Sequence, residues 1–71
     1  MKQMTCAQIR GPEDCGFIVI GRTAEEMAEH ELDHIETAHP DLAKTIKNNS
    51  EQENSRWLTD FRPKFDAAEK L

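Results

Sequence analysis

The chain has no tyrosine, one tryptophan and three phenylalanines among its 71 residues, so it has few large side chains to fill a core. Only 37% of the residues are apolar, whereas 32% are charged. A domain of this size lies near the limit at which a single apolar core sustains a fold. We therefore expect a small domain that gains from an additional source of stability, such as a bound metal ion.

Long apolar runs are also missing. The longest, residues 17–20, has the length of a strand and is much shorter than a membrane span. The first residues lack the apolar region of a secretory signal, so we expect a cytoplasmic protein. In a reducing compartment, two cysteines are more often metal ligands or free thiols than a disulfide.

Basic side chains are scarce in the first part of the chain. Residues 1–44 hold four lysines and arginines against nine acidic residues, whereas residues 45–71 hold five of each. The net charge of −5 therefore arises entirely in the first part. Affinity for nucleic acids and for anionic membranes depends on Lys and Arg, so this charge disfavours both as partners.

The residue pattern predicts a hairpin followed by a helix. The strand candidates are residues 2–6 and 17–20, and the second is β-branched and aromatic between two glycines. Thr23 and Glu26 have the spacing of a capping box, and the helix that they begin should end near His39, ahead of Pro40. Residues 41–47 can form a second helix. The predicted class is α+β: a small ββα zinc-finger-like unit (N-terminal hairpin plus helix about 23–39) with a helical C-terminal extension.

The chain changes character near residue 48, and we predict two parts. Residues 1–47 form a ββα Cys₂His₂-type metal-binding domain, and residues 48–71 form a polar linker with a C-terminal helical, aromatic extension. A linker or a weak helix start is expected over residues 48–55, which are polar and lack apolar periodicity. The aromatic stripe beyond it, Trp57, Phe61 and Phe65, can either pack on the domain or dock in the groove of a partner protein.

Two cysteines followed by two histidines give the order of a tetrahedral zinc site: Cys6, Cys15, His34 and His39. Four residues separate the two histidines, as in other Cys₂His₂ sites, although the eight residues between the cysteines exceed the usual two to four. At about 100° per residue, His34 and His39 flank the apolar side of the helix. His30 points more toward water and is a reserve ligand.

Two thiolates and two neutral imidazoles would neutralise a zinc ion and close its coordination shell. A closed shell is typical of a structural site rather than a catalytic one, so we expect structural zinc as the cofactor. Alternatives stay open at this point. The cysteines can be ordinary buried thiols or form a Cys6–Cys15 disulfide, and the histidines can be boundary or helix-end residues.

Several features within residues 2–42 occur together in one order. Met-Thr precedes Cys6, Cys15 precedes the short apolar strand, Gly-Arg-Thr-Ala-Glu-Glu follows at residues 21–26, and His34 and His39 come last. In these features the chain resembles the DUF1059 family of small prokaryotic proteins, described as predicted small metal-binding proteins. The resemblance implies the same four ligands, but it implies neither a reaction nor a partner, and it does not extend to residues 48–71.

The expected function is that of a small non-enzymatic protein with a structural Cys₂His₂ zinc site, its biological role being open. A finger that reads nucleic acid is disfavoured, because residues 23–39 contain six acidic residues and no Lys or Arg. The alternative is a protein–protein interaction module that uses the acidic helix or the aromatic stripe, without metal. The chain has no phosphate-binding loop, no Cys-x-x-Cys pair and no nucleophile–base arrangement, so no enzymatic activity is expected. Zinc release on oxidation of the thiols is the remaining redox alternative.

Overall fold

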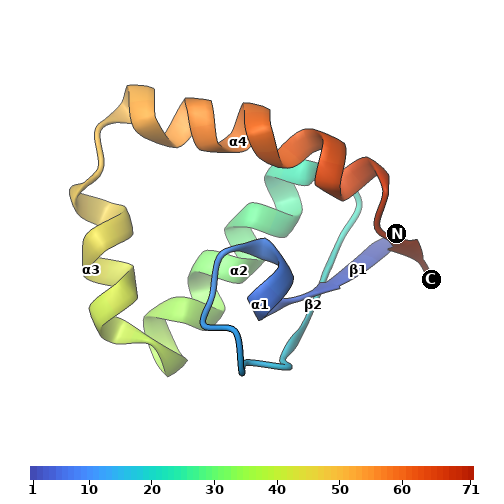
Figure 1. Ribbon diagram of the computed structural model, residues 1–71, viewed down its shortest axis with the longest axis horizontal. Coiled ribbons are helices and arrows are strands. Elements are labelled where there is room, and N and C mark those ends of the chain that lie inside the picture. Colours follow the sequence, from blue (N-terminus) through green and yellow to red (C-terminus); the bar gives the residue numbers. More distant parts are fainter.

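The computed structural model describes all residues, 1–71, as a three-stranded antiparallel sheet with four helices (Figure 1). In chain order the elements are β1 (Lys2–Thr5), α1 (Cys6–Ile9), β2 (Ile18–Gly21), α2 (Ala24–Ala38), α3 (Pro40–Asn48), α4 (Glu51–Asp66) and β3 (Glu69–Lys70). The strand order is β2-β1-β3, so β2 lies at one edge of the sheet. This arrangement confirms the predicted α+β class, with an N-terminal hairpin followed by helices.

The hairpin strands pair with Met4 opposite Val19 and Thr5 opposite Ile18. Because successive side chains point to opposite faces, Met4 and Val19 enter the core, while Ile18 and Ile20 are exposed on the other face. Gly21 ends β2 directly against the backbone of α2, where an added Cβ would lie 2.7 Å from the Met27 nitrogen. Glycine is therefore needed where the strand meets the helix.

The first strand is one residue shorter than predicted, because Cys6 begins the short helix α1. Thr5 caps this helix: its hydroxyl accepts a hydrogen bond from the Gln8 N–H, and the Gln8 side chain accepts one from the Thr5 N–H. This Thr-x-x-Gln capping box is visible in the sequence but was not used in the prediction. Strand β3 was also not predicted, since two residues are too few to show a periodic pattern.

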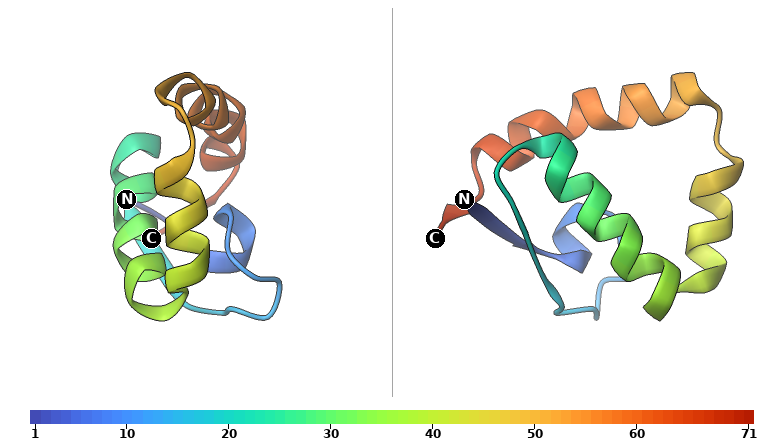
Figure 2. Two further views of the ribbon diagram at one scale, coloured as in Figure 1. Left: turned by 90° about the vertical axis from the view of Figure 1, so that its left-hand side faces the viewer. Right: turned by 180° about the vertical axis from the view of Figure 1, so that it is seen from behind.

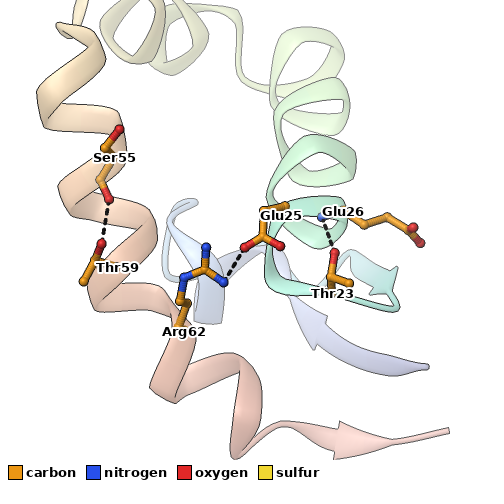
Figure 3. A network of polar contacts seen from close by, with 6 residues as sticks. All are labelled: Thr23, Glu25, Glu26, Ser55, Thr59 and Arg62. Carbon is orange, nitrogen blue, oxygen red and sulfur yellow. Dashed lines mark hydrogen bonds and ion pairs between the residues drawn. The ribbon is translucent and has the colours of Figure 1, made fainter.

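The helix α2 begins where the sequence predicts. The Thr23 hydroxyl accepts a hydrogen bond of 3.0 Å from the Glu26 N–H, as Figure 3 shows. The other half of the predicted capping box differs, because the Glu26 carboxylate accepts from the N–H of Arg22 instead of Thr23. At the far end, α2 stops before His39, and Pro40 is the first residue of α3. His39 therefore lies at the corner between two helices.

The helix α4 begins earlier than the sequence analysis expected. Ser50 and Glu53 form a reciprocal capping box, with the Ser50 hydroxyl accepting from the Glu53 N–H at 3.1 Å. Residues 51–55 are helical, so a helix start, and not a linker, is what the structure shows for this part of 48–55. A capped first turn needs no apolar face, which is why periodicity did not reveal it. None of the four helices has the length and apolar composition that a membrane span requires.

The main core lies between the sheet, α2 and α4. It contains Met4, Ile9, Val19, Ala24, Met27, Phe61 and Phe65. α4 lies against α2 (Figures 1 and 2), and an ion pair between Arg62 and Glu25 joins the two helices (Figure 3). Of the two interpretations of the aromatic stripe, packing on the domain is confirmed for Phe61 and Phe65, both of which are buried.

A second, smaller core cluster lies at the other end of α2. It consists of Cys6, Ile35, Ala43 and Ile46, contributed by α1, α2 and α3. Cys15, Leu32 and Leu42 pack against it and are only partly buried. This end of the molecule thus has few apolar contacts of its own, and the Cys/His group lies here.

Candidate metal centre

The four predicted ligands come from three parts of the fold, namely α1, the loop before β2 and the C-terminal end of α2, and meet in one place. Cys6 begins α1, Cys15 lies in the loop before β2, His34 is in the last part of α2, and His39 is at the α2–α3 corner. One donor atom from each residue, a cysteine Sγ or a histidine ring nitrogen, lies within 4.8 Å of all the others. The structure therefore brings together the complete predicted set.

Two of the distances within this group are close to the sulfur–nitrogen edge of a zinc tetrahedron. The Cys15 Sγ lies 3.4 Å from Nε2 of His34 and 3.4 Å from Nε2 of His39. A tetrahedral zinc ion with Zn–S near 2.3 Å and Zn–N near 2.0 Å requires a sulfur–nitrogen separation of about 3.6 Å. In the absence of metal, the same spacing allows hydrogen bonds between the thiol and the imidazoles. The Cys15 sulfur and the two ring nitrogens are thus already spaced as zinc ligands would be.

The wide spacing between the cysteines is explained by the loop between them. The first four residues from Cys6 form α1, and the chain then turns back, with the Gly11 N–H donating to the Cys6 carbonyl at 2.8 Å. The Ala7 N–H donates to the carbonyl of Cys15 at 3.2 Å, which holds the returning loop beside α1. The two cysteines can therefore lie close together although eight residues separate them in the sequence.

Gly11 allows the loop to pass close to the Cys6 sulfur. A Cβ added at Gly11 would overlap the Cys6 Sγ and would lie 3.1 Å from the Cys6 carbonyl oxygen. At Gly16, the other glycine of this loop, an added Cβ would meet nothing within 4 Å. Within this loop, glycine is therefore required at position 11, beside the Cys6 Sγ, and not at position 16.

The orientation of the histidine rings is set by their neighbours. The Phe17 ring stacks on His34, with centroids 4.0 Å apart and planes 6° from parallel. His39 meets the edge of His34 at a centroid distance of 5.3 Å and an interplanar angle of 84°. The reserve histidine, His30, lies outside the group: it is exposed, and its Nδ1 donates to the Ile20 carbonyl at 2.7 Å.

The environment of Cys6 favours the protonated thiol when no metal is bound. Cys6 is fully buried, and burial raises the pKa of its thiol, with a further increase from the neighbouring Glu31 and Cys15. A bound cation acts in the opposite direction, because a coordinating thiol is deprotonated. Cys6 and Cys15 are both free thiols in the structure rather than a disulfide.

Glu31 is the residue near the site that the sequence analysis missed. The sequence pattern gave it no role beyond being one of the six acidic residues of 23–39, but it is fully buried and neither carboxylate oxygen has a hydrogen-bond partner. Burial raises the pKa of Glu31, while Cys6, the two site histidines and Arg10 act in the opposite direction. Helical geometry could have revealed its burial. At about 100° per residue, Glu31 lies only about 25° from the centre of the apolar side of the helix.

Arg10 is the second charged group on this side of the molecule. Its guanidinium lies over the Trp57 ring, 4.0 Å from the centroid, and its Nε is buried without a hydrogen-bond partner. Burial lowers the pKa of Arg10, and the charge of Glu31 opposes this shift. The cation–π contact gives Trp57, the partly buried end of the aromatic stripe, a role in holding the loop after α1 against α4.

The donor set favours a closed metal site. Two sulfur and two imidazole donors suit tetrahedral zinc, and four protein ligands leave no position for a substrate or water. Glu31 is not within the four-atom group, although its charge acts on Cys6. Comparisons of the chain with protein-family models, with curated proteins and with solved structures find no match, so the functional interpretation depends on this geometry.

Proposed function

We propose that this is a small non-enzymatic protein that binds one structural zinc ion through Cys6, Cys15, His34 and His39. The observation that supports the proposal is the convergence of these four donor atoms within 4.8 Å, from three separate parts of the chain. The resemblance to the DUF1059 metal-binding proteins over residues 2–42 is in keeping with it. A closed Cys₂His₂ shell contributes to folding rather than to catalysis.

The position of the site in the fold agrees with a structural role. The cluster around Cys6 has only four buried residues, compared with seven in the main core. A metal ion held there would cross-link α1, the loop that follows it and the α2–α3 corner, which share few other apolar contacts. Zinc would thus stabilise the end of the molecule that the apolar core supports least.

Native mass spectrometry with elemental analysis tests the proposal directly. The chain purified without added metal should contain one zinc per molecule, and Cys6→Ser or His39→Ala should lose it, because three ligands hold zinc much less tightly than four. His30→Ala is the matched control, since His30 is on the same helix but outside the group. A folded chain that contains no metal, or zinc retained in both ligand variants, would refute the proposed site.

A second prediction concerns the space beside the Cys6 sulfur. Gly11→Ala should lower zinc affinity about tenfold or more, because the new methyl group must displace the sulfur or the loop, and overpacking of this kind costs about 1–3 kcal/mol. Gly16→Ala is the control, since its methyl group would meet no atom. Competition with a chromogenic zinc chelator measures both affinities, and equal values for the two variants would contradict the prediction.

A further inference from the structure

A groove runs along the free edge of β2, beside α2. Its volume is about 490 Å³, and its apolar side is formed by Met1, Phe17, Ile18 and Ile20. Ile18 is 48% exposed and Phe17 is 52% exposed, so both side chains leave about half of their surface open to solvent. Figure 2 (right) shows β2 running beside α2. In the sheet, β2 pairs only with β1, so its other edge has no partner strand.

The strand edge at the base of this groove has main-chain groups that face away from the sheet. The Cys6 N–H donates to the Phe17 carbonyl, so these two residues form a hydrogen-bonded pair. In an antiparallel ladder such pairs alternate with non-hydrogen-bonded ones, which places the N–H and C=O groups of Ile18 and Ile20 on the outer side of β2. The Ile20 carbonyl confirms this direction, because it accepts the hydrogen bond from His30.

This edge lacks the features that usually prevent pairing with another chain. Edge strands are commonly protected by a lysine, a proline or a bulge, and residues 17–21 contain neither a charged residue nor a proline. The hairpin register continues from Lys2–Gly21 to Thr5–Ile18 without a bulge. The Ile20 carbonyl can accept a second hydrogen bond, because a carbonyl oxygen has two lone pairs.

The helix side of the groove is acidic. Glu26 and Asp33 line it, and neither carboxylate forms an ion pair within the chain, whose two salt bridges use Glu25 and Glu36 instead. The two residues are seven positions apart on α2, or about 10 Å along the helix axis. His30 and His34 also line the groove from α2, but no lysine or arginine does. The groove thus combines an apolar side, an open strand edge and two unpaired negative charges.

We propose that this groove binds an extended segment of a partner protein, which adds antiparallel to the edge of β2 and alternates apolar residues with lysine or arginine. Side chains of the added strand opposite Ile18 and Ile20 would share their exposed face and cover them. The intervening side chains would point to the α2 side, toward Glu26 and Asp33. This mode of recognition combines main-chain hydrogen bonds with alternating side-chain contacts.

Charge favours such a segment over a second copy of this chain. Pairing β2 with β2 of another copy would bring together two acidic grooves, each with Glu26 and Asp33, from chains of net charge −5. Like charges held close together across paired strands are destabilising. A basic segment would instead neutralise both carboxylates while covering the same apolar side.

Fluorescence anisotropy with labelled, end-capped peptides tests the proposal on the folded protein as purified. A hexapeptide of alternating valine and lysine should bind, and binding should weaken as salt is raised. The same peptide with lysine replaced by glutamate should bind at least tenfold more weakly. A third peptide, N-methylated at the valines, should also bind at least tenfold more weakly, because it cannot donate main-chain hydrogen bonds to β2. In NMR spectra, the amide signals of Ile18 and Ile20 should shift on addition of the first peptide.

Variants of the protein distinguish binding in this groove from attraction by the negative charge of the whole protein. The double variant Glu26→Gln, Asp33→Asn should weaken binding about tenfold, as expected for two partly exposed ion pairs, whereas Asp60→Asn on α4 should leave it unchanged. Equal binding of the N-methylated peptide, or no binding at millimolar peptide, would overturn the proposal. A concentration-dependent dimer in sedimentation that Ile20→Lys abolishes would assign the edge to a second copy and would also overturn it.

Discussion

Removal of zinc with a chelator at neutral pH should unfold residues 1–40 partly or wholly. Zinc binding in small domains contributes about 10–16 kcal/mol, which is comparable to the whole stability of a folded domain, about 5–15 kcal/mol. Here the metal would join segments that otherwise meet in a cluster of four buried residues. The loss of the ion also leaves the buried Cys6 beside the buried, unpaired carboxylate of Glu31.

Circular dichroism and hydrogen exchange, before and after chelation and again after zinc is restored, measure this effect. We expect a large drop in the melting temperature and loss of protection in α1 and the second half of α2, both reversed by zinc. The His39→Ala variant, which should be purified without zinc, provides a metal-free sample for comparison that has not been treated with a chelator. An unchanged melting temperature after complete metal removal would show that the ion, if bound, has no structural role.

Phe61→Ala should lower the free energy of unfolding by about 3–5 kcal/mol, as for other fully buried phenylalanines. Phe61 is 1% exposed and lies in the main core with Met4, Val19 and Met27. It also stacks on Trp57, with ring centroids 4.9 Å apart. Because α4 contacts the rest of the protein mainly through this stripe, the substitution should release the helix as well as leave a cavity.

Phe17→Ala is the matched control for this prediction. It removes the same atoms from a side chain that is 52% exposed and loses one stacked contact with His34, worth about 0.5–1.5 kcal/mol. Denaturant unfolding of both variants in the presence of zinc gives the two free energies. Similar losses for Phe61→Ala and Phe17→Ala would mean that α4 is not part of the folded core.

Local signals allowed the sequence to predict the elements that surround the site. Thr23 and Pro40 mark the two ends of α2 through a side-chain cap and a backbone restriction, both of which act within one helical turn. The β-branched run at residues 17–20 similarly marks β2. The order and spacing of the cysteines and histidines then indicated the site, because few other arrangements combine these donors.

Two local signals were present in the sequence but were not used. The capping boxes at Thr5–Gln8 and Ser50–Glu53 begin α1 and α4, yet the segments after them lack an apolar stripe in their first turn. The prediction gave more importance to periodicity, which reports burial rather than helix formation as such. Glu31 was missed because it was counted only as part of the acidic composition of the helix, although its helical position lies on the buried side.

The sequence by itself thus determined the hairpin strands and α2, the acidic charge of the first part and the identity of the four donor side chains, since these depend on contacts within a few residues. Only the tertiary structure decided that the Cys15 sulfur lies 3.4 Å from both ring nitrogens, that Glu31 is enclosed, and that the edge of β2 is left open. Those properties depend on how α1, α3 and α4 close around α2. Such long-range packing is a sum over many weak contacts that no short sequence pattern records.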